Sequence, residues 1–478
     1  MRTWAGRQAL ALVALSVAGA GVIYLIWPGA VTDDTFAFLD WGRDWRHGYV
    51  PLLEHRTFHP LPVAVGAVVS LFGQAAPTMT VIAAMAALLL LAAACWRVLS
   101  LLGFRQPAPV LGAALALLSP LLTVLALAAY INLFFASMLM WALAFELEGR
   151  RRATWTLLVL GGLVRPEGWA YLVAYGLLEW WRAGRPLAPR RWLLFAGLAA
   201  TPVVIWLGLE WIMFGQPLYS FHYTRAPNVA NTHSGNADSF LRNIRFGVAQ
   251  AGLVAAAVGV AGVAWLAPRG RALVTIGMAV VALISLIVLA SSSFNVPGRH
   301  FSVLVALLCV LAAAGACTAG RALGRFYRGP GSVLAALAGA GLLLLFAAPP
   351  DVRQVRSQYR HVSAVHDAGA TLASTVRRAR HLIDTQGARR HSVAMLGAVF
   401  NAELVWDLGV PFNAVTGQQE DHARLIVQPS YKTWASLAAE HLTDRQRIEK
   451  PPGWRRLTRT PWQIFGRGHH VPVRLGVK

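Results

Sequence analysis

Long apolar segments separated by short polar links make up most of the first 350 residues. They lie at about 9–27, 78–102, 107–119, 121–145, 153–165, 168–181, 192–214, 246–266, 271–291, 300–319 and 332–348, and several of them are short. A helix needs about twenty apolar residues to cross a bilayer, and it satisfies its own backbone hydrogen bonds there. The pattern therefore predicts an all-α polytopic membrane protein with about eleven transmembrane helices.

The pattern changes at "PPDVRQVRSQYRHV", after which the chain is polar and charged. Helical spacing, short apolar runs and turn residues predict elements in the order helix, strand, helix, strand and hairpin. These elements fall at about 353–385, 391–400, 401–409 (closed by Gly409), 423–428 and 454–467. We expect a membrane-embedded module over residues 1–350 and a small soluble α/β domain over residues 351–478.

The charges of the links predict the orientation in the membrane. "GFRQ", "EGRRR", "RAGRPLAPRR", "APRGR" and "GRALGRFYRGPG" are all rich in arginine. Alternating the spans from a cytoplasmic N-terminus places all five inside, in agreement with the positive-inside rule. The C-terminal domain and the residues after the first span are then extracytoplasmic. Residues 60–73 are apolar but short, so we expect outer-face juxtamembrane helices at about 33–73 rather than a further span.

Composition narrows the class of protein further. The chain is 56% hydrophobic, has only 13% charged residues and carries a net charge of +22. Because the basic residues gather in the links, topology explains them better than nucleic-acid binding does. Cys95, Cys309 and Cys317 lie inside apolar runs and are predicted to be buried rather than disulfide-bonded. Frequent alanine, arginine and tryptophan suggest a bacterium with GC-rich DNA, so we expect a multi-pass protein of a bacterial plasma membrane.

The stretch "VTDDTFAFLDWGRDWRHG" (residues 31–48) follows the first span. Its spacing predicts a helix capped by Thr32 or Asp33, with Phe38, Trp41 and Trp45 on one face. Such a helix is typical of the membrane interface.

Two adjacent carboxylates, Asp33 and Asp34, begin this predicted helix. One reading is structural, because acidic residues cap a helix and complement its dipole. The other reading is chemical, because paired carboxylates at a membrane surface can hold a cation or keep one group as a proton acceptor. The sequence pattern alone leaves both open.

Together with four later motifs, this acidic pair resembles the GT-C glycosyltransferases, which use polyprenyl-phosphate sugars. The motifs are "FHPLPVAVGAVVSLFG", "GLVRPEGW", "FGQPLYSFHYTRA" and "VPGRHFSVLVALL", in the same order as in that family and within residues 32–308. "GLVRPEGW" is similar to an element of the actinobacterial-type arabinofuranosyl- and mannosyltransferases. The chain departs from the pattern where Arg225 replaces a loop lysine and where the last motif lacks its second proline.

The resemblance implies an inverting transfer of a sugar from a polyprenyl phosphate to a glycan, lipid or protein acceptor of the cell envelope. One carboxylate, Asp33 first and Asp34 second, would be the general base, and the other would orient the acceptor or bind a metal. The implied donor-phosphate ligands are Arg165, Arg299 and Arg225, and the implied substrate contacts are His59, Glu167, His222, Tyr223 and His300. No cofactor is certain, although the two carboxylates could hold Mg²⁺, Mn²⁺ or Ca²⁺.

Structural alternatives stand beside these roles. Arg165 could be an interfacial anchor and Arg225 part of a solvated loop, while Glu210 near a span end is either functional or interfacial. The spacing of His47, His55 and His59 does not secure a zinc site. A transporter or flippase for a lipid-linked envelope precursor is the rival function. Transporters usually carry mid-membrane charges and paired halves, and the sequence pattern shows neither.

Overall fold

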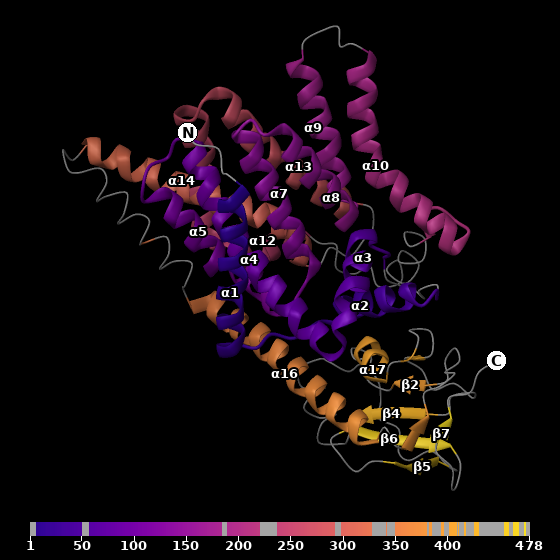
Figure 1. Cartoon of the computed structure of the whole chain (residues 1–478). Coiled ribbons are helices and arrows are strands. Elements are labelled where there is room, and N and C mark those ends of the chain that lie inside the picture. The colour runs from indigo at the N-terminus through magenta and orange to yellow at the C-terminus, as the bar shows by residue number, and fades with distance from the viewer. Residues whose placement is uncertain are drawn as a thin grey trace. The chain divides into compact units, whose positions relative to one another are not determined.

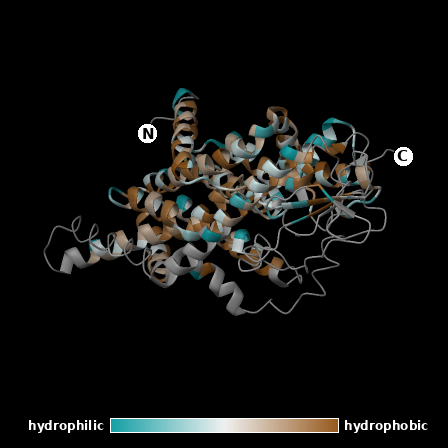
Figure 2. Ribbon diagram, turned by 90° about the horizontal axis from the view of Figure 1, so that it is seen from below, coloured by the Kyte–Doolittle hydropathy of each residue, from teal (hydrophilic) through white to brown (hydrophobic). Residues whose placement is uncertain are grey.

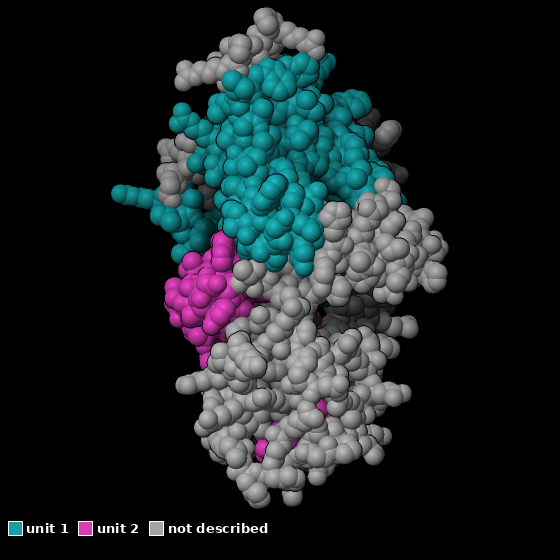
Figure 3. All heavy atoms as spheres, turned by 90° about the vertical axis from the view of Figure 1, so that its right-hand side faces the viewer, with its two compact units in different colours: residues 1–27, 55–61, 82–357 teal, residues 28–54, 62–81, 358–478 magenta. Residues whose placement is uncertain are grey.

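The chain divides into two compact units, which are coloured separately in Figure 3. Unit 1 comprises residues 1–27, 55–61 and 82–357, and unit 2 comprises residues 28–54, 62–81 and 358–478. The computed structural model describes residues 6–49, 57–183, 189–219, 237–291, 298–326, 341, 349–379, 382–384, 393–395, 401–408, 410, 415–416, 425–429, 454–457, 462–467 and 473–474. The predicted boundary near residue 350 stays a prediction, because the compact units group the chain differently.

Unit 1 is helical throughout its described part (Figure 1). Its helices are α1 (Gly6–Ile26), most of α4 (Ala76–Leu101), α5 (Ala108–Leu118), α6 (Pro120–Leu127), α7 (Ile131–Leu147), α8 (Arg151–Val164), α9 (Gly168–Arg182), α10 (Pro189–Phe214), α12 (Ala237–Leu266), α13 (Arg269–Ser291), the 3-10 turn η2 (Gly298–Phe301) and α14 (Ser302–Phe326). Ten of the predicted apolar segments are therefore helical. The predicted span at 332–348 lies outside the described residues, apart from residue 341.

Hydrophobic residues dominate these helices (Figure 2), and several helices are long enough to cross a membrane. Within the described residues, five helical segments meet that test, or six if α5 and α6, bent by 55°, count as one span. Helices α8 and α9 have only 14 and 15 residues, fewer than a full crossing needs. The chain is a multi-pass membrane protein, and the expected eleven crossings are not shown.

One predicted span is not a single continuous helix. The apolar run at 121–145 forms two helices, because α6 ends at Leu127 and α7 begins at Ile131. Between them Ala129 adopts a left-handed conformation with φ of 52°. That conformation ends a helix, and glycine usually occupies it. Since the run contains no glycine or proline at this point, the sequence pattern gave no sign of the break.

Helices α12 and α14 pack with their backbones almost in contact. A Cβ atom added to Gly259 of α12 would lie 1.8 Å from the Leu311 carbonyl oxygen, and one added to Gly315 of α14 would lie 1.8 Å from that of Ala255. Small residues at a helix interface allow such an approach inside a membrane. Helix α14, almost wholly buried, is thereby held at the centre of unit 1.

Unit 2 combines juxtamembrane segments with the C-terminal elements. It contains α2 (Asp33–Arg46), most of α3 (Pro60–Val69), the 3-10 helix η1 (Ser70–Ala75), most of α16 (Pro349–Ala379), α17 (Asn401–Leu408) and strands β1 (Ile383–Asp384), β2 (Val393–Met395), β3 (Val415–Thr416), β4 (Leu425–Pro429), β5 (Trp454–Arg456), β6 (Trp462–Arg467) and β7 (Val473–Arg474). The predicted helix, strand, helix, strand and hairpin occur in that order, and β1, β3 and β7 are further strands that the sequence pattern did not predict.

The strands form a mixed sheet in the order β3-β2-β4-β6-β5, and β1 pairs with β7 separately (Figure 1). Strand β2 is parallel to β3 and β4, whereas β6 is antiparallel to β4 and β5. The indole of Trp462, fully buried on β6, donates a hydrogen bond of 3.0 Å to the Ala368 carbonyl of α16. This bond fixes the long helix against the sheet.

Helix α2 is packed within unit 2 far more completely than its sequence predicted. A Cβ atom on Gly42 would lie 2.1 Å from the Ala67 backbone nitrogen, so α2 and α3 meet backbone to backbone. Phe38 and Trp41 are buried within the protein, whereas Trp45 of the same predicted face is 37% exposed. The three rings of the predicted interfacial face therefore differ in environment, because α3 covers part of α2 at the glycine contact and leaves Trp45 less covered than Phe38 and Trp41.

Arg43 of α2 ties this helix to α17. Its Nη2 donates a hydrogen bond of 2.6 Å to the Val410 carbonyl, and its guanidinium lies 5.4 Å from the centre of the Trp406 ring. The same nitrogen lies 3.0 Å from Oδ1 of Asp40 and 3.6 Å from Oδ1 of Asp44, both buried. Arg43 thus compensates two buried carboxylates and links α2 to the C-terminal elements.

Asp407 of α17 makes the stability of unit 2 dependent on pH. Burial raises the pKa of this carboxyl from 3.8 to about 7, against the opposing charge of Arg377. Its contribution to stability is therefore complete below the unfolded pKa and is lost as the pH rises through about 7. We expect Asp407→Asn to raise the free energy of unfolding by roughly 1–3 kcal/mol more at pH 8 than at pH 5. Thermal unfolding of the full chain in detergent measures this, and an equal effect at both pH values would contradict it.

Candidate active site

The "RPEG" motif forms the turn between α8 and α9. Helix α8 ends at Val164 because Arg165 precedes a proline, which disfavours helical backbone at that position, and Arg165 is extended with φ of −148° and ψ of 140°. Helix α9 starts at Gly168, where an added Cβ would lie 2.7 Å from the Gly162 backbone. A larger residue would push the two helices apart, so this glycine sets the tightness of the turn.

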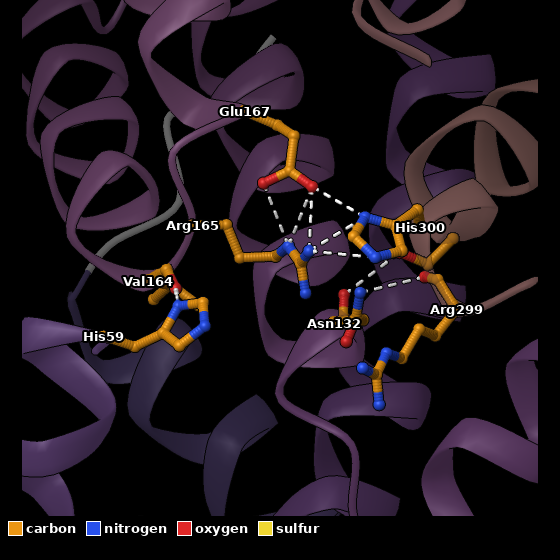
Figure 4. Close-up of polar contacts among 8 residues, drawn as sticks. His59, Asn132, Val164, Arg165, Glu167, Arg299 and His300 are labelled. Carbon is orange, nitrogen blue, oxygen red and sulfur yellow. Dashed lines mark hydrogen bonds and ion pairs between the residues drawn. The ribbon is translucent and has the colours of Figure 1, made fainter. Parts of the chain in front are cut away.

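Arg165 and Glu167 form a two-point ion pair across this turn (Figure 4). Nη2 lies 2.8 Å from Oε1, and Nε lies 3.1 Å from Oε2. The two side chains are only 9% and 14% exposed. Such a fork-to-carboxylate arrangement fixes the plane of the guanidinium. Within the described residues, Nη1 of Arg165 makes no hydrogen bond, so it remains able to donate to a ligand.

His300, from the 3-10 turn η2, completes the cluster. Its Nδ1 lies 2.8 Å from Oε1 of Glu167 and 2.9 Å from Nη2 of Arg165 (Figure 4). A guanidinium only donates, so Nδ1 must accept from Arg165 or donate to Glu167 and cannot do both at once. The imidazole therefore has two alternative hydrogen-bonding states at this position.

Glu167 stays ionised in this environment. Burial alone would raise the pKa of its carboxyl, but the Arg165 charge and the His300 hydrogen bond together hold the pKa well below 4.5. The pair therefore contributes stability at neutral pH, and that contribution is lost only as the pH falls through this lowered pKa.

Asn132 of α7 is a site residue that the sequence reasoning missed. Its Nδ2 donates a hydrogen bond of 3.0 Å to the Arg299 carbonyl, and the Ser302 hydroxyl donates 3.2 Å back to the Asn132 carbonyl. The Arg299 guanidinium itself lies 5.3 Å from the centre of the Tyr130 ring. A single buried amide within the apolar run "YINLFFASM" was the signal that could have identified it.

These polar groups line one wall of a small hollow of about 10 Å³, which has room for about one water molecule. Asn132, Arg165, Glu167 and His300 contribute the polar side. Apolar side chains of α7, α13 and α14, with Phe135, Leu286, Val303 and Leu304 among them, contribute the other side. The hollow therefore has a polar wall whose guanidinium can attract an anionic group, and an apolar wall opposite it.

The other predicted site residues fall in three places. His59 is buried, and its Nδ1 lies 2.7 Å from the Val164 carbonyl oxygen. Asp33 and Asp34 are the first two residues of α2 in unit 2, after the N-cap residue Thr32. Asp34 is half-buried, whereas the side chain of Asp33 lies outside the described part. Also outside it are Arg225, His222, Tyr223 and His55.

The structure thus brings together Arg165, Glu167, His300 and the backbone of Arg299 within unit 1. It places Glu210, fully buried on α10, against the Trp206 indole rather than in this cluster. Within the described part of the chain, no group of three or more His, Cys, Asp or Glu side chains could hold a metal ion. A cation at Asp33 and Asp34 stays a prediction.

In its fold the chain is similar to ArnT. A crystal structure of ArnT from Cupriavidus metallidurans bound to undecaprenyl phosphate matches with a TM-score of 0.61, and the apo structure of the same protein matches with a TM-score of 0.56. Each match is 15% identical in sequence and covers 97% of this chain and 100% of ArnT.

The likeness to ArnT extends over nearly the whole chain, so both units take part in it. At 15% identity it is a likeness of fold. No family model matches the sequence, and no curated protein sequence matches it either. The likeness to ArnT therefore establishes the architecture of the chain.

Proposed function

We propose that the protein is an integral membrane inverting glycosyltransferase. It moves a sugar from a polyprenyl-phosphate donor to a glycan, lipid or protein acceptor of the cell envelope, at the outer face of a bacterial plasma membrane. The observation that supports this best is the Arg165–Glu167–His300 cluster beside an apolar wall, in a fold similar to that of ArnT, one structure of which holds undecaprenyl phosphate.

Arg165 has the geometry for binding the donor phosphate. Glu167 holds two of its nitrogens and so fixes the direction of the third, Nη1, which points away from the carboxylate in Figure 4. Guanidinium groups match phosphate oxygens in shape and charge. Arg299 and Arg225 are the further cations that we assign to the donor phosphate.

In the reaction, the acceptor hydroxyl oxygen bonds to the anomeric carbon while the bond from that carbon to the phosphate oxygen breaks. Asp33 takes the hydroxyl proton as general base, with Asp34 as the second candidate, and the other carboxylate orients the acceptor. The polyprenyl phosphate leaves as an anion, so it needs compensating charge rather than a proton. Arg165 supplies that charge in a site with little water.

A donor panel tests the proposal. Purified protein in nanodiscs is incubated with radiolabelled polyprenyl-phosphate hexoses and pentoses and with envelope glycan, lipid and protein acceptors. We expect one donor to give a labelled product and an equal amount of free polyprenyl phosphate. Binding of undecaprenyl phosphate is measured in parallel. The same protein is also reconstituted in proteoliposomes. Movement of a lipid-linked precursor from one leaflet to the other, without sugar transfer, would instead support the transporter alternative.

A further inference from the structure

Two side chains cap the C-terminal end of α8, Trp169 from the adjacent helix α9 and His59 from a distant segment. The last carbonyls of a helix lack partners within it. Here the Gly162 carbonyl accepts a hydrogen bond of 3.1 Å from the Trp169 indole, and the Val164 carbonyl accepts one of 2.7 Å from His59 Nδ1 (Figure 4). Because a carbonyl oxygen only accepts, His59 must carry its proton on Nδ1.

Both capping side chains rest on one buried indole, Trp206 of α10. Trp206 meets the His59 ring edge-on at 5.4 Å and the Trp169 ring edge-on at 5.7 Å between ring centres. It is itself fixed, because its Nε1 donates 3.0 Å to Oε1 of Glu210, and both residues are 0% exposed. His59 is therefore a rigid support rather than a side chain turned towards solvent.

The bond from His59 controls the peptide group that leads into Arg165. The Val164 carbonyl and the Arg165 amide belong to one planar peptide unit. His59 donates a hydrogen bond to the oxygen of this peptide group. The Arg165 N–H of the same group donates a hydrogen bond of 2.9 Å to the Gly161 carbonyl. This peptide group is thus held at both its oxygen and its N–H. It leads directly into Arg165, whose guanidinium lines the hollow.

We infer that His59 is a positioning residue for Arg165, acting through the Val164–Arg165 peptide and not by contact with substrate. The consequence for ligand binding rests on the proposed function, since it requires Arg165 to bind the donor phosphate. The resemblance to GT-C enzymes suggested a substrate contact for His59, and the geometry assigns it this different role.

A pair of substitutions tests the inference. His59→Asn keeps an amide N–H near the position of Nδ1, whereas His59→Leu has similar size and no donor. Hydrogen–deuterium exchange over residues 163–169 is measured without ligand, and undecaprenyl phosphate binding is titrated. We expect His59→Leu to speed exchange about tenfold or more and to weaken binding about tenfold. His59→Asn should stay within about threefold of wild type in both.

Two controls and one replacement variant complete the test. Thr201→Val removes a similar side-chain bond, to the Gly197 carbonyl in an exposed part of α10, and should change neither readout. In an Arg165→Ala background, His59→Leu should weaken binding no further. If His59→Leu does not fold, His59→Gln replaces it, because its amide reaches past the Nδ1 position.

Unchanged exchange in His59→Leu, equal losses in the Leu and Asn variants, or additive losses with Arg165→Ala would overturn the inference. A wild-type protein that binds no undecaprenyl phosphate would count against the proposed function. The exchange measurement would still decide whether His59 positions Arg165.

Discussion

Asp33→Asn is expected to abolish sugar transfer while leaving the protein folded and able to bind undecaprenyl phosphate. The amide preserves size but cannot take the proton of the acceptor hydroxyl, so the rate should fall on the order of 100-fold or more. The structure assigns the N-cap position of α2 to Thr32, so Asp33 is not the cap residue. Loss of its charge near the helix start should cost at most about 1 kcal/mol of stability. Single-turnover transfer and thermal unfolding measure the two quantities.

Matched variants separate the roles of the two carboxylates. Asp34→Asn should be milder if Asp34 only orients the acceptor, and equally severe if both carboxylates hold a cation. A chelator distinguishes these cases, because only the second makes transfer sensitive to it. Thr32→Ala changes only the N-cap residue of α2, so the rate of sugar transfer should stay unchanged. Wild-type transfer by both single variants and by the double Asn variant would remove the chemical role of the pair.

Arg165→Ala is expected to lower the efficiency of donor use about a hundredfold with little change in the acceptor KM. Losing a charge-assisted contact to phosphate in a site with little water costs roughly 2–3 kcal/mol. The variant also leaves Glu167 without its main partner, so thermal unfolding is measured alongside donor kcat/KM. A combined Arg165→Ala, Glu167→Gln variant removes that second effect, and donor efficiency should stay low in it.

Arg165→Lys provides the control for charge. It keeps the cation but not the fork that Glu167 holds at two points, so we expect donor efficiency between those of wild type and Arg165→Ala. Donor kinetics unchanged in both variants would show that Arg165 is an anchor at the membrane interface, the structural alternative that its sequence context also allowed.

Local sequence signals predicted much of the fold, because helix ends and turns depend mainly on neighbouring residues. The proline after Arg165 ends α8 where the sequence placed the break, and the turn residues between β5 and β6 gave the hairpin. The break between α6 and α7 was missed because Ala129 takes a conformation that glycine normally signals. The burial of Asp40 and Asp44 was missed because it depends on Arg43 and on a contact with residues more than 360 positions away.

The candidate site was predictable in part for the same reason. The charged residues of "RPEG" and "GRH" stood out in an apolar chain, and the structure places Arg165, Glu167 and His300 together. Their supports did not stand out. Asn132 and His59 act on backbone carbonyls, and no spacing in the sequence shows which carbonyl a distant side chain will reach.

The tie between α2 and α17 limits how far the protein can be shortened. Cutting the chain at residue 350 would remove the Val410 carbonyl and the Trp406 ring from Arg43. Helix α2, which begins with Asp33, would then lose one of the surfaces that shape it. We therefore expect α2 to need the C-terminal segment in order to adopt its native packing. A membrane portion expressed alone would not be equivalent to the intact protein.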